Sequence, residues 1–269
     1  MTVDSNRTDF ASIDFDGRRR LAIDLAVEAG RLARNMRQGL GAIESKSSID
    51  FCTAADLAVE NLVRQRIADA FGDPVIGEEA GGDPADLVWV VDPIDGTTNY
   101  IHGTTNWCVS LALVHRGEIE LGVIYAPDLD QLFVARRGEG ATMNGRPLRT
   151  SGLRHGGGAV VEMGWSARRP LALSLDLISA MIANTIEFRR CGSGAMGLAN
   201  VALGISDGYI ELHINAWDAL AGLLLVREAG GWVNDFLAND GLRQGNTVVA
   251  CTAELTDRLL ALEALRTVR

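Results

Sequence analysis

Two aspartates at the end of an apolar run are the residues whose types and spacing first suggest chemistry. Leu87 to Val91 is rich in β-branched and aromatic residues, which predicts a strand that is buried on both faces and ends at Val91. Asp92 and Asp95 follow at once, together with a proline and a glycine that favour a turn. Carboxylates held close together away from water repel one another, and a proton or a hard cation such as Mg²⁺ neutralises them. The stretch fits an ordinary turn as well as it fits a metal site.

Two more acidic groups stand at the ends of predicted elements. Glu78 and Glu79 follow a short extended piece, and Asp218 lies at the start of a predicted helix. Each has an ordinary explanation on its own, since Glu78 could be a surface-loop acid and Asp218 could favour the positive end of its helix.

The elements that must position these acids follow from the hydrophobic periodicity. Residues 17–37 have helical spacing, and Thr53 to Asp56 resembles a capping box that begins a second helix. From Trp107 to about Leu148 the alternation predicts a run of antiparallel strands, with turns at Arg116-Gly117 and Asn144-Gly145. Beyond that point we predict helices at 169–184, 194–204, 217–229 and 253–266, and strands near 159–163, 187–191, 208–212, 232–234 and 247–251.

This order of elements predicts a layered α+β architecture with more than one sheet. The helix at 169–184 has Leu171, Leu175, Ile178 and Ile182 on one face. We expect one domain over residues 1–269, with a soft subdivision near residue 150, where the loop is richest in glycine and serine.

Composition excludes some classes of function. Lys+Arg 25 against Asp+Glu 35 gives a net charge of −10, without a basic block, which argues against nucleic-acid or anionic-membrane binding. No secretory signal and no apolar run of about 18–20 residues is present, so we expect a soluble cytoplasmic protein. The cysteines are far apart and predict reduced, buried side chains: Cys52, Cys108, Cys191 and Cys251.

Taken together and in this order, the acidic motifs resemble the inositol monophosphatase family of magnesium-dependent, lithium-sensitive phosphatases. The resemblance runs from about residue 20 to the last predicted strand. The matching stretches are Lys46 to Asp56, Gly77-Glu78-Glu79, Asp92-Pro93-Ile94-Asp95-Gly96-Thr97-Thr98-Asn99, Trp217-Asp218-x-x-Ala221-Gly222 and Glu228-Ala229-Gly230-Gly231. The resemblance implies a layered αβαβα sandwich of the sugar and inositol phosphatase type.

The resemblance also implies a division of labour among the acids. Two to three Mg²⁺ ions per active site would be held by Glu78, Asp92, the Ile94 carbonyl, Asp95 and Asp218, with Asp92 shared between two of them. Two cations a few ångströms apart activate an attacking water and stabilise the leaving oxygen.

The remaining catalytic parts are implied in the same way. Thr97 and Glu78 would orient the water, and Asp56 would hold the Thr97 hydroxyl in register. Lys46 and Asp50 would lie in the supporting shell. The amides of Gly96 and Thr97, at the start of a helical turn, would bind the phosphate.

The resemblance implies that a separate set of residues selects the substrate. Asp95, Ser193, Gly194 and Glu211 would face the alcohol portion, and a carboxylate such as Glu211 can accept hydrogen bonds from a polyol. The chain departs from the family at Gly194, where alanine is frequent, and at Asn215, where histidine or proline is common. Both departures lie near the leaving group.

We therefore expect an Mg²⁺-dependent phosphomonoesterase that hydrolyses inositol 1-phosphate or a related polyol phosphate. Histidinol phosphate, fructose 1,6-bisphosphate and a nucleotide 3′-phosphate are alternatives within the same class. A non-catalytic protein-binding scaffold is the alternative of another class. By resemblance the protein is a homodimer.

Overall fold

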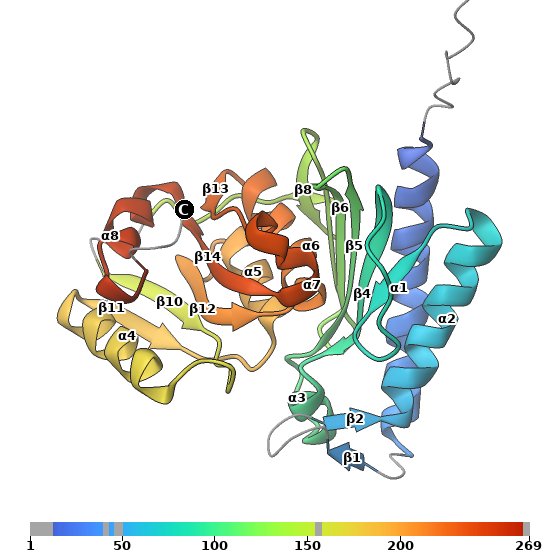
Figure 1. The fold of residues 1–269 in the computed structure, drawn as a ribbon, viewed down its shortest axis with the longest axis horizontal. Coiled ribbons are helices and arrows are strands. Elements are labelled where there is room, and N and C mark those ends of the chain that lie inside the picture. The colour runs from blue at the N-terminus through green and yellow to red at the C-terminus, as the bar shows by residue number, and fades with distance from the viewer. Residues whose placement is uncertain (1–12, 40–42, 46–50, 154–157, 266–269) are drawn as a thin grey trace, which may run out of the picture.

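The chain forms five alternating layers of helices and sheets (Figure 1). The structure is a computed structural model and describes residues 13–39, 43–45, 51–153 and 158–265. Two sheets separate three layers of helices, which confirms the predicted layered αβαβα sandwich. The outer helices beside the first sheet are α1 (Phe15–Arg37) and α2 (Ala54–Ala70), the inner helices are α5 (Gly194–Ala202) and α6 (Ala216–Glu228), and the outer helices beside the second sheet are α4 (Leu171–Ala183) and α8 (Thr256–Leu260).

The first sheet has seven strands in the order β3-β4-β5-β6-β7-β8-β9. Only the β3–β4 pair is parallel, and the antiparallel neighbours turn tightly at Arg116-Gly117 and Asn144-Gly145, where all four residues have positive φ as two-residue hairpin turns require. The strands are β3 (Val75–Gly77), β4 (Leu87–Asp95), β5 (Cys108–His115), β6 (Glu118–Ala126), β7 (Gln131–Arg136), β8 (Gly140–Met143) and β9 (Arg146–Pro147).

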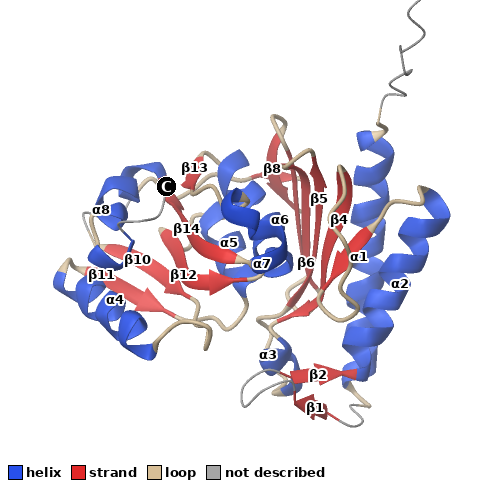
Figure 2. Ribbon diagram, in the orientation of Figure 1, coloured by secondary structure: helices blue, strands red, loops and turns tan. Residues whose placement is uncertain are grey.

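The second sheet has five strands in the order β11-β10-β12-β14-β13. Strand β10 is parallel to both of its neighbours, whereas β14 is antiparallel to both of its own (Figure 2). The strands are β10 (Ala159–Met163), β11 (Ile186–Arg189), β12 (Gly208–Ile214), β13 (Gly231–Val233) and β14 (Asn246–Thr252). The remaining elements are a small pair, β1 (Ile43–Ser45) with β2 (Phe51–Thr53), and the short helices α3 (Thr97–Ile101), η1 (Ala238–Asp240), α7 (Gly241–Gln244), η2 (Ala253–Leu255) and η3 (Glu263–Leu265).

The inner helix α6 is held between the two sheets by close packing. A Cβ at Gly122 of β6 would lie 2.7 Å from the Ala221 carbonyl oxygen, and one at Gly222 would lie 2.4 Å from Leu198 of α5. Small residues at these places let helix and sheet approach closely. At the far end of the helix, Glu228 accepts hydrogen bonds from Gly138 N (2.9 Å) and Gly140 N (2.8 Å). Gly222 and Glu228 of α6, together with Gly122 of β6, therefore fix the position of the helix.

Two expectations from the sequence were wrong in detail. Strand β4 does not end at Val91 but continues to Asp95, because a β-bulge accommodates Pro93 within the ladder. The helix expected at 253–266 is instead η2, α8 and η3, whose mixed α and 3₁₀ turns suit the spacing of the buried Leu255, Leu259, Leu262 and Leu265.

Helix α4 buries a face other than the one that carries Leu171, Leu175 and Ile182. Its buried residues are Ser174, Leu177 and Met181, while Leu171, Leu175 and Ile182 are exposed. The helix is apolar on both faces, so periodicity alone did not identify the buried one.

The chain passes from one sheet to the other between β9 and β10, near residue 150. A hydrophobic cluster that includes Val88, Leu220 and Val248 joins the inner helices to both sheets, and we propose on that basis that they form one domain. Among the described helices, none is both long and apolar enough to cross a membrane.

Candidate active site

The β-bulge at the end of β4 brings Asp92 and Asp95 into the same site. Asp92 pairs with Ser110 and Asp95 with Cys108, so one extra residue of β4 is accommodated between the two aspartates. Within the bulge, Ile94 N donates to Asp92 Oδ1 at 2.9 Å. Since successive strand residues point to opposite faces, an extra residue is what lets two aspartates three positions apart share a face.

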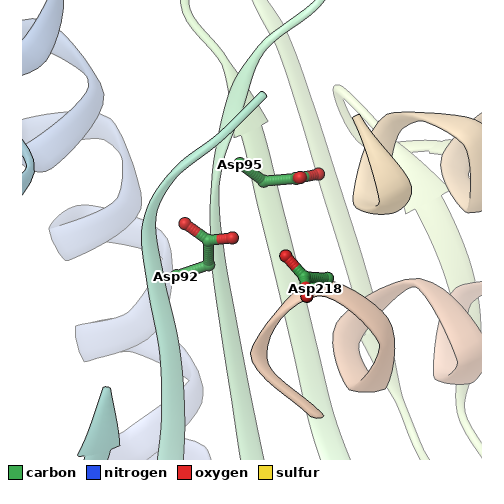
Figure 3. A group of neighbouring side chains, drawn as sticks. All are labelled: Asp92, Asp95 and Asp218. Atoms are coloured by element: carbon green, nitrogen blue, oxygen red, sulfur yellow. The ribbon is translucent and has the colours of Figure 1, made fainter. Parts of the chain in front are cut away.

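Asp218 approaches the same point from the inner helix layer. It lies in the first turn of α6, where its carboxylate accepts a hydrogen bond from Asn215 N at 3.2 Å and completes a capping box. One ligand atom of each of Asp92, Asp95 and Asp218 lies within 4.8 Å of the other two. Figure 3 shows the three carboxyl groups converging from β4 and from the beginning of α6. The ordinary capping role and a place in the acidic cluster therefore coexist.

The surroundings of this cluster favour neutralisation of its charges. Burial is the largest cause that raises the pKa of Asp92 well above its usual range, and the charges of Glu78, Asp95 and Asp218 raise it further. Burial, then the charges of Asp95 and Glu78, likewise raises the pKa of Asp218 well above its usual range. Asp92 Oδ2 is buried, and no described residue forms a hydrogen bond with it. An all-oxygen donor set with an orphaned buried carboxylate oxygen suits a hard divalent cation.

Asp95 also connects the strand to helix α5. Its carboxylate accepts hydrogen bonds from Ser193 Oγ (2.5 Å), Ala195 N (2.7 Å) and Gly194 N (3.2 Å). Ser193 in turn caps α5 by accepting from Met196 N at 3.1 Å. Burial still raises the pKa of Asp95, although these hydrogen bonds lower it. Ser193 and Gly194, which were predicted to contact the substrate, therefore lie against Asp95. Ser193 also caps helix α5.

Glu78 lines the same cavity and is held there by a buried acid that the sequence analysis did not identify. Glu60 of α2 is 1 % exposed, and its carboxylate accepts from Glu79 N (2.7 Å) and Ala80 N (3.0 Å). A Cβ at Gly77 would lie 2.4 Å from that carboxylate, so only glycine lets the loop pass. Asp56 and Glu60 are four residues apart on an apolar helix face, and that spacing is the signal that could have revealed the pair.

Thr97 begins α3 beside the bulge. Its hydroxyl donates to the Ile94 carbonyl at 3.0 Å and lies 3.5 Å from Asp56 Oδ1. A hydroxyl has a single proton, so these contacts are alternatives and the shorter one is to Ile94. Asp56 is occupied mainly by the capping box of α2, where its carboxylate accepts from Thr53 N at 2.8 Å. Burial raises the pKa of Asp56 despite that bond.

A cavity of about 410 Å³ surrounds the acidic cluster. Glu211 lines it and is 8 % exposed, and its carboxylate accepts from the Tyr209 hydroxyl at 2.6 Å. Burial raises the pKa of Glu211 to about 7. Gly96 has φ 91°, and a Cβ there would lie 2.9 Å from the Asn106 carbonyl oxygen, so the backbone beside Thr97 requires glycine.

The cavity thus brings together most of the residues that the sequence singled out. Asp56 lies behind Thr97, and Lys46 and Asp50 fall outside the described residues. The lining residues in the predicted set are Glu78, Asp92, Ile94, Asp95, Gly96, Thr97, Ser193, Gly194, Glu211 and Asp218.

Other lining or bracing residues were not predicted. Asn99 donates to the Asn106 carbonyl (2.6 Å) and to the Cys191 carbonyl (2.8 Å), which ties the β4–α3 segment to the loop before α5. Arg168 and Arg190 line the mouth of the cavity. Each of them stands next to a second arginine, and neither position carries a spacing signal, so only the fold could place them in the cavity.

Comparison with known proteins gives a consistent result. The model of the inositol monophosphatase family matches residues 16–266. A Nus factor SuhB of Xylella fastidiosa is 37% identical over 233 residues, which are 82% of this chain and 84% of that protein.

Two solved structures are similar over nearly the whole chain. The SuhB of Bartonella henselae has TM-score 0.83 and 32% identity, and the match covers 92% of this chain and 98% of that one. An IMPase of Thermotoga maritima has TM-score 0.81 and 31% identity, with 93% and 96% covered.

The raised pKa values predict how metal-free protein responds to pH. Asp92, Asp95, Asp218 and Glu211 titrate higher in the folded than in the unfolded chain, so the folded state binds more protons above the unfolded values near 4. Stability is therefore present at low pH and lost as pH rises through the folded values. We expect the melting temperature in EDTA to fall between about pH 5 and pH 8, and millimolar Mg²⁺ to reverse most of that fall.

Asp92→Asn supplies the internal comparison, because it removes one of the charges that must be buried. In EDTA at pH 8 this variant should melt above the wild type, whereas the exposed Asp86→Asn should not. If the wild-type melting temperature in EDTA rises with pH, the buried carboxylates do not destabilise the metal-free protein in the way expected here.

Glu60 generates a second prediction. In Glu60→Gln an amide nitrogen replaces one of the acceptors for Glu79 N and Ala80 N, so the loop that carries Glu78 loses a restraint. We expect Mg²⁺ affinity, measured by calorimetry, to fall about tenfold, as when outer partners of metal ligands are changed. Asp69→Ala, on the exposed face of the same helix, is the control. If the Mg²⁺ affinity of Glu60→Gln equals that of the wild type, Glu60 does not support the cation site.

Proposed function

The chain belongs to the inositol monophosphatase family, and from this premise we propose that it is an Mg²⁺-dependent phosphomonoesterase acting on inositol 1-phosphate or a related polyol phosphate. The observation that carries the proposal is the buried cluster of Asp92, Asp95 and Asp218, in which Asp92 Oδ2 has no hydrogen-bond partner among the described residues. These acids come from the end of a strand and the start of a distant helix, and without a metal their mutual repulsion destabilises the fold. Bound cations would remove that repulsion, so a function that needs cations explains why the three acids lie together.

We assign two to three Mg²⁺ ions to Glu78, Asp92, the Ile94 carbonyl, Asp95 and Asp218. When bound, the ions supply activation of water and neutralisation of charge on the phosphoryl oxygens. The β4 bulge turns Asp92 and Asp95 toward Asp218, and Glu60 holds the Glu78 loop against them. The geometry of the cluster is thereby built into backbone positions before any ligand arrives.

The protein's own groups then have separate tasks. The Gly96 and Thr97 amides bind the phosphate where α3 begins. Thr97 and Glu78 orient the attacking water, and Asp56 restrains the Thr97 hydroxyl when the Ile94 carbonyl is engaged by a cation. Asp95, Ser193, Gly194 and Glu211 face the alcohol, with Glu211 accepting hydrogen bonds from its hydroxyls. Water attacks phosphorus directly, so no phosphoenzyme forms.

A second function is suggested by the relative from Xylella fastidiosa, which is named a Nus factor. A protein-binding role in addition to catalysis is therefore our second candidate. We further propose a cytoplasmic, lithium-sensitive homodimer, as in the family to which the chain belongs.

Phosphate release tests the catalytic proposal. Purified protein in millimolar Mg²⁺ should release phosphate from at least one member of a panel that contains inositol 1-phosphate, histidinol phosphate, fructose 1,6-bisphosphate and a nucleotide 3′-phosphate. Asp92→Asn should lower kcat by at least about 100-fold, because it removes a shared cation ligand. Asp86→Asn, an exposed aspartate just before β4, should retain wild-type kcat.

If no panel member releases phosphate, the proposed phosphatase activity is refuted and the protein-binding role remains as the candidate function. Near-normal turnover in Asp92→Asn, with the fold verified by circular dichroism, would refute the assignment of the cations.

A further inference from the structure

Tyr209 is a buried residue of the cavity to which the proposed mechanism assigns no task. It lies on β12, is 2 % exposed, and lines the cavity together with Glu211. Alternate strand residues point to the same face, and Ile210 between them packs on the other face in a hydrophobic cluster with Leu177 of α4. Tyr209 therefore lies beside the carboxylate that we propose to contact the alcohol portion of the substrate.

The hydroxyl of Tyr209 holds one oxygen of the Glu211 carboxylate. It donates to Glu211 Oε2 at 2.6 Å, and no other described residue donates to that carboxylate. The second oxygen, Oε1, accepts no hydrogen bond within the part of the chain that the structure describes. Because Glu211 lines the cavity, Oε1 is available to accept a hydrogen bond from a bound ligand.

Glycines on two sides restrict the position of the Tyr209 side chain. A Cβ at Gly197 of α5 would lie 2.5 Å from Tyr209 Cδ2. A Cβ at Gly164 would lie 2.5 Å from the hydroxyl oxygen and would overlap the Glu211 carboxylate. Gly164 N donates to the Ile210 carbonyl at 2.9 Å, which holds this segment against β12. The ring, its hydroxyl and the carboxylate are therefore closely packed between α5 and the segment after β10.

The hydroxyl of Tyr209 remains a donor at the pH values at which Glu211 is charged. Burial is the largest cause that raises the pKa of Tyr209 well above its usual range, and the charge of Glu211 raises it further. Burial raises the pKa of Glu211 to about 7, and the hydrogen bond from Tyr209 acts against that rise. The tyrosine thus favours the charged form of Glu211, in which both carboxylate oxygens are acceptors.

We propose that Tyr209 is a positioning residue that makes the enzyme selective for polyol phosphates. Its hydroxyl holds Glu211 Oε2, so that Oε1 accepts a hydrogen bond from a free hydroxyl on the alcohol portion of the substrate. The inference rests on the proposed function and adds to it a residue outside the acidic motifs. A carboxylate that is already oriented loses less conformational freedom when the alcohol binds. An alcohol without that hydroxyl leaves the acceptor unpaired and binds more weakly.

Two phosphate esters with the same carbon ring test the inference. Inositol 1-phosphate carries free ring hydroxyls and cyclohexyl phosphate carries none, so the wild type should have the higher kcat/KM for inositol 1-phosphate. Tyr209→Phe keeps the ring against Gly197 and removes only the hydroxyl. We expect it to lower kcat/KM for inositol 1-phosphate about tenfold, mainly through KM, and to change the value for cyclohexyl phosphate less than about threefold.

Tyr125→Phe is the matched control. Tyr125 is also a buried tyrosine on a strand, and its hydroxyl donates to Asp130 Oδ1 at 3.3 Å. Neither of these two residues is in the lining of the cavity. This variant should keep kcat/KM for both esters within about twofold of the wild type.

A double-mutant cycle determines whether Tyr209 acts through Glu211. Added to Glu211→Ala, Tyr209→Phe should lower kcat/KM for inositol 1-phosphate less than about twofold, compared with about tenfold in the wild-type background. Calorimetry in a Thr97→Ala background with Mg²⁺ measures binding directly. There the Kd for inositol 1-phosphate should be about tenfold weaker with Tyr209→Phe and unchanged with Tyr125→Phe.

Three results would overturn the inference. Tyr209→Phe could affect both esters equally or neither, in which case its hydroxyl does not select the alcohol. The full loss could persist in the Glu211→Ala background, in which case Tyr209 acts through another group. The wild type could fail to prefer inositol 1-phosphate to cyclohexyl phosphate. If the wild type releases phosphate from any ester, the proposed function stands in all three cases, whereas release from none refutes the function itself.

Discussion

Repulsion among buried carboxylates is the constraint on which the rest of the structure depends. Asp92, Asp95 and Asp218 each place a ligand atom within 4.8 Å of the others, and in the part of the chain that the structure describes Asp92 Oδ2 has no hydrogen-bond partner. Bringing such charges out of water raises the free energy of folding unless protons or cations neutralise them. The fold must therefore hold the acids against their own repulsion and offer the site to cations.

The scaffold meets this requirement with backbone features more than with side-chain pairing. A bulge in β4 turns two aspartates to one face, and the start of α6 presents the third. Gly122 and Gly222 let α6 approach both β6 and α5 closely enough to place Asp218. These are features of strand register and helix packing, and they are present in the fold without any ligand.

Much of this could be predicted from the sequence where local chemistry determines structure. The capping box at Thr53 and the turn at Asn144-Gly145 form as expected because each depends on a few adjacent residues. The acidic residues of the cavity were recognised because they stand in motifs. The bulge was not predicted because a proline usually ends a strand. Whether Pro93 can stay within the ladder depends on the pairing with strand β5. Arg168 and Arg190 were missed because their place in the lining of the cavity depends on the fold.

Binding of divalent cations by the acidic cluster is tested most directly in crystals grown with Mn²⁺, because the anomalous scattering of manganese identifies the ion at each site. We expect at least two peaks, with the Asp92 carboxylate contacting both and Asp95, Asp218 and Glu78 completing their ligands. An ordered cavity without a peak, or peaks only at exposed acids elsewhere, would contradict it.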